Sequence, residues 1–301
     1  MTAPDLSICI VNWNTRDDLE QALASIPNPD PGVSTQVIVV DNDSHDGSAR
    51  MVRERFPVAV LIESGENLGF ARGYNRAVVE SSGRYLLVLN PDTVIHSSAL
   101  KTLTAYMDAH PHVGAAGPRL LNSDGSLQYS CRRFPTPIAA LFRNTVLGKL
   151  LGPDRFTRDY LMADWDHSAA RDVDWISGAA MCVRREAWDT VGGFDEGFFM
   201  YAEDMDWCLR AHQAGFQVHY VPGAVITHRI GRSSDQRPIA MVIQFHRSMA
   251  RFYRKHYAPR WPWGLRWAPL LGVWLRAGIV LAQVLWDESR DRWHTRGVTA
   301  R

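Results

Sequence analysis

Short apolar runs alternate with segments of helical spacing through the first 110 residues, and this alternation constrains the fold more than any other feature of the sequence. The apolar runs, which predict buried strands, are Leu6–Asn12, Gln36–Asp41, Val58–Glu63 and Arg84–Leu89. The helical segments that follow them are Thr15–Ser25, His45–Arg55, Gly69–Ser81 and Ser97–His110. Strands that alternate with helices over short links predict an α/β domain with a mostly parallel central sheet.

Polar side chains follow three of these strands, at the edge where parallel sheets gather their ligands. The residues are Asn12, Asp41 and Asp92. Asp41 can accept hydrogen bonds from a nucleobase, or it can serve as a turn residue or helix cap. Asp92 can hold a divalent cation against a diphosphate, or it can belong to an Asx turn that begins at Asn90. The chain has neither a GxGxxG motif after the first strand nor a P-loop motif, so neither of these nucleotide sites is predicted.

The most informative stretch of the second half is an acidic segment beside aromatic residues. Segment 192–207, GGFDEGFFMYAEDMDW, places Glu203, Asp204 and Asp206 at the start of a helix expected over Glu203–Ala214. Acids at this end of a helix are stabilised by its dipole, which is a structural explanation for them. An ionised carboxylate in a cleft can also take a proton from an attacking hydroxyl, which is the catalytic explanation.

The other elements of the second half are less regular. A loop-rich stretch over 131–172 precedes strand structure at 173–183. Two later strands are expected at Gln217–Val221 and Ala224–His228. His228 ends the second of them, where a neutral imidazole either completes a metal site begun by Asp92 or plays a structural part.

Seven motifs that occur in one order together resemble glycosyltransferase family 2. They are IVNWN, VVDNDSHDGS, ENLGFARGYN, LLVLNPDT, ISGAAMCVRR, GGFDEGFFMYAEDMDWCLR and the late His228. The resemblance covers about residues 5–230 and is strongest to the bacterial rhamnosyltransferase-like branch. It implies a GT-A fold, in which a Rossmann-like nucleotide half (about 1–120) joins an acceptor half (about 121–235). It also implies an inverting transferase that uses a nucleotide-diphosphate sugar and Mg²⁺ or Mn²⁺.

The resemblance further implies a role for each matching position. Asp204, with Glu203 beside it, matches the catalytic acid pair, and Asp204 is the expected base. Asp92 and His228 match metal ligands, but Asn90 stands where many members have Asp. The donor and nucleotide side is expected to include Asn12, Asp41, Asn67, Arg72, Asn75 and Asn90. The acceptor and sugar side is expected to include Gly178, Trp175 and Tyr201.

The last part of the chain differs in charge and composition. Residues 247–301 hold 11 Lys and Arg against 3 Asp and Glu, together with six of the 11 tryptophans. Helices are expected over Gln236–His256 and over the apolar segment Leu270–Trp286, whose polar stripe is Arg276, Gln283 and Asp287. A membrane span is not predicted, because the segment is short and Arg276 lies in its middle. We expect 236–301 to form an amphipathic helical tail on a membrane surface, with a packed core helix as the alternative.

The predicted function is therefore transfer of a sugar from a nucleotide diphosphate to a hydroxyl of a cell-envelope or polyprenyl-linked glycan. Rhamnose from dTDP-rhamnose is the donor that the resemblance favours. A hexose or galactofuranose donor and an inactive nucleotide-sugar-binding protein are the alternatives. Nucleic acid is not an expected partner, because the basic tail lacks a recognisable nucleic-acid module. Four scattered cysteines and a start without a basic segment predict a cytoplasmic protein. The amphipathic tail predicts that it lies peripherally on the inner face of the membrane.

Overall fold

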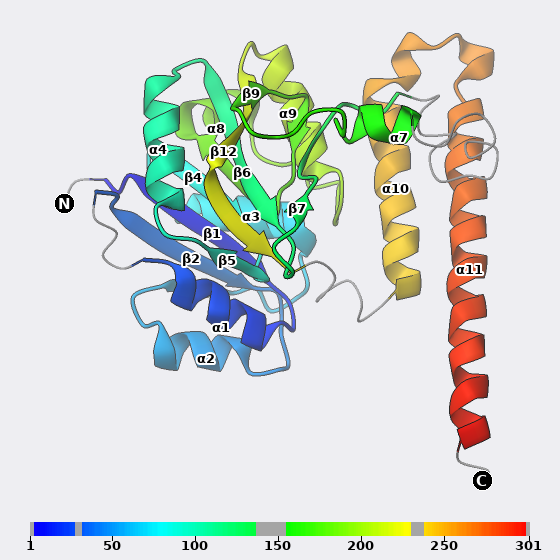
Figure 1. Cartoon of the computed structure of the whole chain (residues 1–301), viewed down its shortest axis with the longest axis horizontal. Helices are drawn as coiled ribbons and strands as arrows, with labels where there is room; N and C mark the ends of the chain where they lie inside the picture. The colour runs from blue at the N-terminus through cyan, green and yellow to red at the C-terminus, as the bar shows by residue number, and fades with distance from the viewer. Residues whose placement is uncertain (1–2, 28–31, 137–154, 230–237, 299–301) are drawn as a thin grey trace. The chain divides into compact units, whose positions relative to one another are not determined.

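The computed structural model describes residues 3–27, 32–136, 155–229 and 238–298 (Figure 1). The chain divides into two compact units. The first comprises Met1–Phe134 with Arg158–Ser233, and the second comprises Pro135–Thr157 with Ser234–Arg301. All of the predicted catalytic, donor, metal and acceptor residues belong to the first unit, and the basic, Trp-rich helices belong to the second.

A mixed sheet forms the centre of the first unit, with its main strands in the order β3-β2-β1-β4-β11-β6-β12-β5. These strands are β1 (Leu6–Asn12), β2 (Thr35–Asp41), β3 (Val60–Glu63), β4 (Tyr85–Leu89), β5 (Thr93–Ile95), β6 (Val113–Leu121), β11 (Ala180–Arg184) and β12 (Gln217–His228). Short strands β7 (Leu127–Gln128) and β9 (Arg171–Asp172) pair with β6 and β12. A separate two-stranded pair joins β8 (Cys131–Arg132) to β10 (Trp175–Ile176).

The parallel part of the sheet is its N-terminal part. Strands β3, β2, β1 and β4 run parallel to their neighbours, and the register sets Asn12 opposite Asp41. Beyond β4, strand β11 is antiparallel to both β4 and β6, while β6 and β12 are parallel to each other. The predicted parallel sheet is therefore found in the first half of the chain, and the second half makes the whole sheet mixed.

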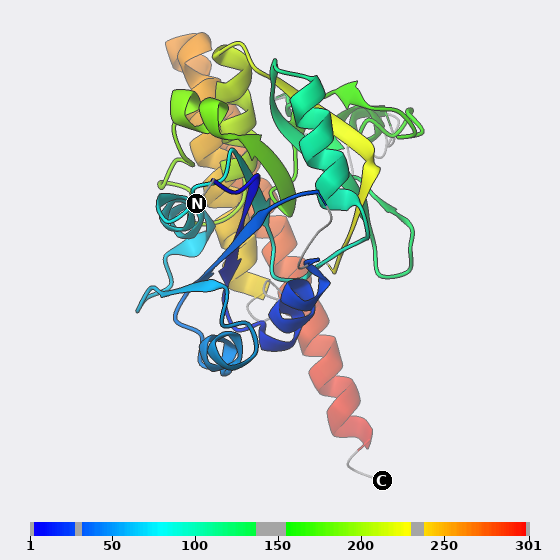
Figure 2. The same ribbon diagram turned by 90° about the vertical axis from the view of Figure 1, so that its left-hand side faces the viewer.

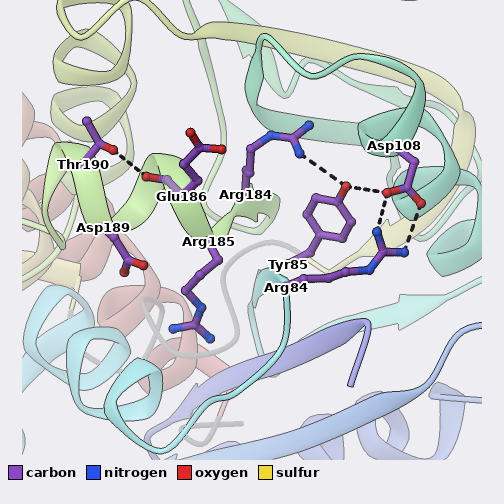
Figure 3. Close-up of a pocket in the computed structure, with 8 residues that line it drawn as sticks. All are labelled: Arg84, Tyr85, Asp108, Arg184, Arg185, Glu186, Asp189 and Thr190. Atoms are coloured by element: carbon purple, nitrogen blue, oxygen red, sulfur yellow. Dashed lines mark hydrogen bonds and ion pairs between the residues drawn. The ribbon is translucent and has the colours of Figure 1, made fainter. Parts of the chain in front are cut away.

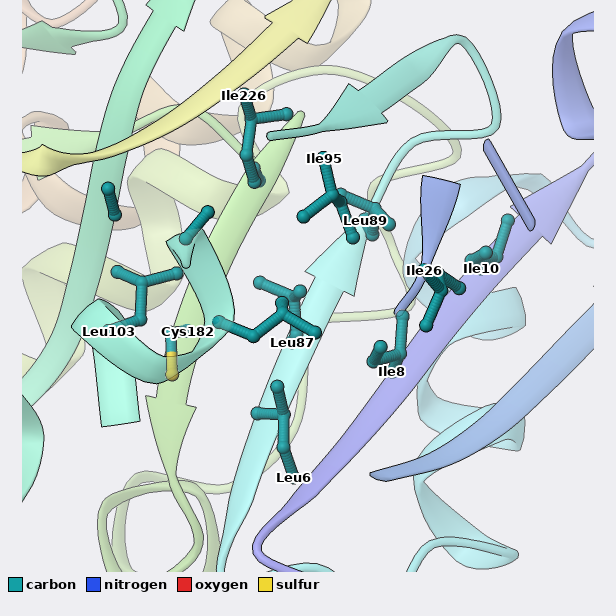
Figure 4. Close-up of a cluster of buried hydrophobic side chains, with 14 of the residues drawn as sticks. Leu6, Ile8, Ile10, Ile26, Leu87, Leu89, Ile95, Leu103, Cys182 and Ile226 are labelled. Carbon is teal, nitrogen blue, oxygen red and sulfur yellow. The ribbon is translucent and has the colours of Figure 1, made fainter. Parts of the chain in front are cut away.

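Helices cover both faces of this sheet. They are α1 (Arg16–Ser25), α2 (Ser48–Arg55), α3 (Gly69–Val79), α4 (Ala99–Ala109), α8 (Arg185–Val191) and α9 (Glu203–Gln213), and a further helix, α7 (Arg155–Tyr160), lies between β8 and β9 in the chain. Helices α1 and α2 lie side by side in both views, in blue (Figures 1 and 2). Alternate residues of β1, such as Ile8 and Ile10, join one hydrophobic cluster with side chains of α1, α2 and α4 (Figure 4). On the other face of β1, Val11 packs against α3 at Gly73, where a Cβ would come within 2.8 Å of the valine.

Strand β6 is the largest element that the apolar pattern did not predict. Its sequence, VGAAGPRLL, contains two glycines and a proline, residues that are depleted in strands. The fold needs the small residues, because a Cβ at Gly114 would lie 2.7 Å from Phe216 and one at Gly117 would lie 2.9 Å from Ile176. Close packing therefore removed the hydrophobic signal by which the other strands were identified.

Smaller differences concern element boundaries. Helix α2, expected over His45–Arg55, begins at Ser48, where Asp46 accepts hydrogen bonds from the Ser48 amide and hydroxyl. The two strands expected at 217–221 and 224–228 are one strand, β12, with a register shift between Val221 and Val225. Helix α8 was not predicted.

The second unit contains α10 (Pro238–His256) and α11 (Ala268–Val298), which pack against each other. Ala250 and Tyr253 of α10 form a small buried cluster with Leu270 of α11. Arg276, expected on the polar stripe of the tail, is half-buried and lies over the Phe245 ring of α10 at 5.9 Å. The exposed apolar residues include Leu271, Trp274, Leu275, Ile279, Leu285 and Trp286. The apolar face of α11 is thus turned away from α10.

Candidate active site

The carboxyl ends of β1 and β2 hold a buried polar network around Asp41. The Asn12 side-chain amide donates to Asp41 Oδ1 at 3.1 Å, and the Ser44 backbone N–H donates to Asp41 Oδ2 at 2.9 Å. Thr15 donates its hydroxyl to Asn12 Oδ1 at 2.7 Å. The bond from Ser44 makes Asp41 a turn residue, as one of the two interpretations of the sequence expected. A carboxylate has about four lone-pair positions, so Asp41 retains acceptor capacity for a ligand.

The start of α3 carries three residues expected on the nucleotide side. Asn67 Oδ1 accepts a hydrogen bond from the Gly69 amide at 3.0 Å, in the turn that leads into the helix. Asn75 holds the loop before α9, since its side chain donates to the Phe194 carbonyl and accepts from the Phe194 amide, both at 2.9 Å. Arg72 is half-exposed and lies within 3.9 Å of Glu66 and Glu196 carboxylates. The contacts of Asn67, Asn75 and Arg72 described here are all with other parts of the protein, so their roles in binding the nucleotide remain predictions.

Asp204 is held at the first turn of α9 by two backbone N–H groups. Gly178 donates to Asp204 Oδ2 at 2.8 Å, and Met205 donates to Asp204 Oδ1 at 2.7 Å. Gly178, predicted for the acceptor side, therefore contacts the predicted base directly. The two residues before the helix, Tyr201 and Ala202, both adopt left-handed backbone angles, with φ of 68° and 67°. Such angles cost about 1–3 kcal/mol each in non-glycine residues and cluster at functional sites.

Glu203 and Asp204 are adjacent in sequence but differ in their environment. Burial raises the pKa of Glu203 to about 8, and the negative charge of Asp204 adds to this rise. Within the described part of the chain, Glu203 Oε2 has no hydrogen-bond partner. Burial also raises the pKa of Asp204, but the amides of Gly178 and Met205 oppose this rise. Burial and the charge of Asp204 therefore favour the protonated form of Glu203, and the two amides favour the ionised form of Asp204.

Asp206, the third acid of the segment, has a structural role. It is fully buried and accepts a hydrogen bond from Arg210 Nε at 2.9 Å. The same guanidinium donates to the carbonyl oxygens of Val191 and Gly193, both at 2.8 Å. Asp206 thus fixes the loop that leads into α9 and leaves Asp204 as the candidate base.

Asp92 and His228 come together as the sequence predicted. Strand β5 pairs with the end of β12, with Thr93 opposite His228, and this pairing sets Asp92 Oδ1 at 3.2 Å from His228 Nε2. Asp92 Oδ1 is buried and accepts no hydrogen bond from any described residue. The Asn90 side-chain amide lies 3.4 Å from the same imidazole nitrogen.

This pair fits a Mg²⁺ or Mn²⁺ ion that takes its other ligands from substrate. In the described ranges, no group of three or more His, Cys, Asp and Glu side chains could hold a metal ion. Mg²⁺ in phosphate-transferring sites is commonly held by one or two carboxylates, substrate phosphates and water. An orphaned buried carboxylate oxygen beside an imidazole nitrogen suits such an ion.

Three residues near these acids were not singled out from the sequence. Tyr74 of α3 is buried, and its hydroxyl lies 3.1 Å from the Leu89 carbonyl and 3.2 Å from Asn90 Oδ1. Burial is the main cause that raises its pKa, and the negative charge of Glu203 is the next. The other two residues are Gln128, which contacts His228, and Arg132. Tyr74 belongs to the ENLGFARGYN motif, although no role was assigned to it there, whereas Gln128 and Arg132 lie outside all of the quoted motifs.

Trp175, predicted for the acceptor side, lies in the interior with 5% of its surface exposed. Its indole N–H donates to the Arg133 carbonyl at 3.0 Å. The Arg132 guanidinium lies 5.0 Å from the centre of its ring, and the charge of Arg132 lowers the pKa of Asp204. Trp175 is therefore linked to Asp204 through Arg132, which lies over its ring.

A cavity of about 590 Å³ opens at the other end of β4 from this site (Figure 3). Tyr85, which lines it, begins the strand, whereas Asn90 follows the last residue. On one side of it, Asp108 accepts hydrogen bonds from Arg84 and from the Tyr85 hydroxyl, and Arg184 Nη1 lies 3.4 Å from that hydroxyl. Residues of α8 line the other side, and the cavity is separate from the acids described above.

Residues 4–250 match the sequence model of a family described as glycosyltransferase like family 2. The chain belongs to glycosyltransferase family 2. The N-acetylglucosaminyl-diphospho-decaprenol L-rhamnosyltransferase of Mycobacterium tuberculosis is 30% identical over 302 residues, which cover 95% of this chain and 96% of the relative. Rhamnosyltransferase WbbL of Escherichia coli is 31% identical over 173 residues, 55% of this chain and 62% of WbbL. The predicted likeness to the rhamnosyltransferase-like branch of family 2 is confirmed.

Solved structures with the same fold are also glycosyltransferases. The mannosyltransferase PcManGT from Pyrobaculum calidifontis, in complex with GDP-Man and Mn²⁺, superposes with a TM-score of 0.56 at 18% identity, over 92% of this chain and 70% of that chain. TarS 1–349 from S. aureus superposes with a TM-score of 0.52 at 14% identity, over 91% of this chain and 80% of that chain. These similarities confirm the predicted α/β GT-A fold of this family 2 glycosyltransferase.

The loop before α9 depends on one glycine at the start of α3. Gly69 has φ of +76°, and a Cβ there would lie 2.3 Å from the Phe199 carbonyl oxygen. We expect Gly69→Ala to lower the free energy of unfolding by about 2–4 kcal/mol, since backbone strain and a collision with main chain add. Gly65→Ala is the matched control, because Gly65 has φ of +70° with no atom near its Cβ position. Urea unfolding of both variants measures the difference, and equal losses would show that the contact at Phe199 is unimportant.

Proposed function

We propose that this chain is an inverting glycosyltransferase that moves rhamnose from dTDP-rhamnose to a hydroxyl of a polyprenyl-linked glycan. The observation that carries the proposal is the Asp204 carboxylate, held by two backbone N–H groups at the start of α9. The M. tuberculosis relative is named for rhamnosyl transfer to a sugar-diphospho-decaprenol, and this chain spans almost its whole length. That name supports both the donor sugar and the lipid-linked acceptor.

The chemistry follows from the positions of the acids. An acceptor hydroxyl at Asp204 loses its proton to the carboxylate as its oxygen bonds to the anomeric carbon of the donor. The bond between that carbon and the diphosphate oxygen breaks on the opposite side, which inverts the configuration and releases the nucleoside diphosphate. Burial favours the protonated form of Glu203, which keeps a second negative charge away from the base. Aligning both substrates for this in-line displacement is the other contribution of the site.

Asp92 and His228 would hold the metal ion of this reaction. A bound Mg²⁺ or Mn²⁺ supplies positive charge that stabilises the leaving diphosphate. The Mn²⁺ named in the PcManGT complex supports a divalent cation in this fold. Asn90, an amide where many members have a carboxylate, leaves Asp92 as the anionic ligand of the pair.

A donor screen tests the proposal. Purified chain is incubated with Mg²⁺, a short N-acetylglucosaminyl-diphospho-polyprenol and, in turn, dTDP-rhamnose, UDP-galactofuranose and GDP-mannose. We expect nucleotide release and glycolipid product with dTDP-rhamnose, and NMR of the product should show the inverted anomeric configuration. Turnover only with another donor would replace rhamnose, and tight donor binding without turnover would favour an inactive binding protein.

We further propose that α11 attaches the enzyme to the inner face of the cell membrane. Within the described residues, the segment Trp263–Trp286 is long and apolar enough to cross a bilayer by length and composition. Its exposed tryptophans and leucines suit the interfacial layer, and the arginines of the tail attract anionic lipids. Arg276 near its middle is costly in the bilayer core, which favours a surface position.

Two charges on the exposed face of α11 should release the protein from membranes. We expect the double variant Leu275→Glu with Ile279→Glu to weaken binding to anionic liposomes about tenfold or more. A tenfold change corresponds to about 1.4 kcal/mol, which the loss of one buried apolar side chain already supplies. Gln283→Glu, on the same helix, adds charge without removing an apolar group and should change binding little. Liposome flotation measures binding, and retention of the wild-type chain in alkaline carbonate would show a membrane span instead. Equal binding by the double variant would mean that this face does not contact lipid.

A further inference from the structure

Gln128 makes three polar contacts, of which two link β7 to the end of β12 and the third reaches Asn122, just after β6. Its side-chain nitrogen donates to the His228 carbonyl oxygen at 3.2 Å and to Asn122 Oδ1 at 2.9 Å. Its side-chain oxygen lies 2.7 Å from His228 Nδ1. Pairing of β7 with β6, which sets Gln128 opposite Leu120, brings the side chain to this position. One amide therefore contacts both the backbone and the ring of the same histidine.

These contacts fix the orientation of the amide. A backbone carbonyl oxygen can only accept hydrogen bonds, so the NH₂ group of Gln128 must face the His228 carbonyl. The amide oxygen then faces His228 Nδ1, and the short contact requires a hydrogen on that nitrogen. With the opposite orientation, two acceptor oxygens would face each other at 3.2 Å and two nitrogens at 2.7 Å. The hydrogen-bond network thus assigns the proton of the neutral imidazole to Nδ1.

The assignment determines what His228 presents to Asp92. With Nδ1 protonated, Nε2 carries a lone pair, and it lies 3.2 Å from the buried Asp92 Oδ1. Two electron-pair donors at this distance repel each other unless they share a proton or a metal cation. The Asn90 amide, 3.4 Å from Nε2, is a weak partner at that length.

We propose that Gln128 is a positioning residue that fixes the Nδ1–H tautomer of His228, so that Nε2 points its lone pair at a divalent cation held with Asp92. The proposal rests on the proposed function for the use of that cation. Outer hydrogen bonds of this kind orient metal-binding histidines, and their loss commonly reduces metal affinity by about 10–100-fold. Gln128 itself would not touch the cation or the substrates.

The test compares three variants of the full chain in two measurements that do not depend on turnover. Gln128→Leu removes both the acceptor and the donor, Gln128→Glu keeps an oxygen at Nδ1, and Tyr129→Phe is a neighbouring control on the exposed side of the same segment. NMR of ¹⁵N-labelled histidine at pH 8, above the ordinary histidine pKa of about 6.5, reports the tautomer. The Mn²⁺ signal in electron paramagnetic resonance, with dTDP present, reports metal affinity. Thermal unfolding verifies that each variant is folded.

We expect the Nδ1–H tautomer in the wild type, a mixture in Gln128→Leu, and a loss of Mn²⁺ affinity of about 10–100-fold in that variant. Gln128→Glu should retain the tautomer and most of the affinity, and Tyr129→Phe should match the wild type. An Nε2–H tautomer in the wild type, or unchanged Mn²⁺ affinity in folded Gln128→Leu, would overturn the proposal. If Gln128→Leu does not fold, the tautomer of the wild-type chain alone decides, and an Nε2–H tautomer there overturns the proposal. Wild-type chain that binds no Mn²⁺ but transfers sugar in EDTA would overturn the cation role and leave the glycosyltransferase function standing.

Discussion

Asp204→Asn is expected to lower the rate of sugar transfer by about 10²–10⁴-fold, the usual contribution of a general base. The amide has the shape of the carboxylate but cannot take the proton of the acceptor hydroxyl. Donor affinity should change little, because the hydrogen bonds of Asp204 go to Gly178 and Met205. Initial rates with dTDP-rhamnose and donor binding by calorimetry, measured on the same preparation, separate the two effects.

Glu203→Gln is the matched control, since it makes the same chemical change one residue earlier. The pKa of Glu203 is raised to about 8, so this side chain is already neutral at pH 7 and an amide resembles its resting state. Transfer at pH 7 should therefore fall far less than in Asp204→Asn. The gain in the free energy of unfolding of the variant over the wild type should also be larger at pH 8 than at pH 5. Because the pKa of Glu203 is raised in the folded state, the folded wild type binds more protons than the unfolded chain between about pH 4.5 and about pH 8. The wild type therefore loses stability as the pH rises through this window, and the variant does not.

The two variants together decide which acid is the base. A large loss in Glu203→Gln with near-normal turnover in Asp204→Asn would exchange the roles of the two acids. Large losses in both, with weakened donor binding, would assign the pair to the donor pocket. The pH profile gives a further check: burial raises the pKa of Asp204, so transfer should fall on acidification at a higher pH than an ordinary aspartate would give.

The sequence predicted the nucleotide half of the fold well because hydrophobic periodicity is strongest there. The strands β1, β2 and β4 are fully or largely buried apolar runs, and their ends carried the polar residues that marked the site edge. Strand β6 was missed because close packing at Gly114 and Gly117 replaced large apolar residues by small ones. Periodicity detects a strand through its side chains, and it fails where the neighbouring layer needs the space.

The candidate site divides in a similar way. Asp92 and His228 lie 136 positions apart in the chain, and only the order of motifs suggested that they meet, which the structure shows at 3.2 Å. Asn75 and Trp175 were assigned to ligand contacts by resemblance, whereas their observed hydrogen bonds hold a loop and a backbone carbonyl. Gln128 could not be found from the sequence, because its importance comes from its distance to His228.

Removing the divalent cation is expected to stop transfer, and substitution of Asp92 should reproduce most of that loss. EDTA should abolish turnover with dTDP-rhamnose, and added Mg²⁺ or Mn²⁺ should restore it, because the leaving diphosphate needs a positive charge beside it. Asp92→Ala should weaken Mn²⁺-dependent dTDP binding more than His228→Ala, since the carboxylate contributes a negative charge and the neutral imidazole does not.

Asp92→Asn separates the charge of this ligand from its shape. The amide keeps the shape but not the charge, so it should behave like Asp92→Ala if attraction to the cation is what matters. Asn90→Asp is the complementary change. It should raise Mn²⁺ affinity, because it adds a negative charge near His228 Nε2, which lies 3.4 Å from the Asn90 amide. Calorimetric titration of dTDP, with Mn²⁺ and with EDTA, measures each variant. Full transfer in EDTA, together with unchanged dTDP binding in Asp92→Ala, would contradict the metal site and would shift the neutralisation of the diphosphate to nearby arginines such as Arg132.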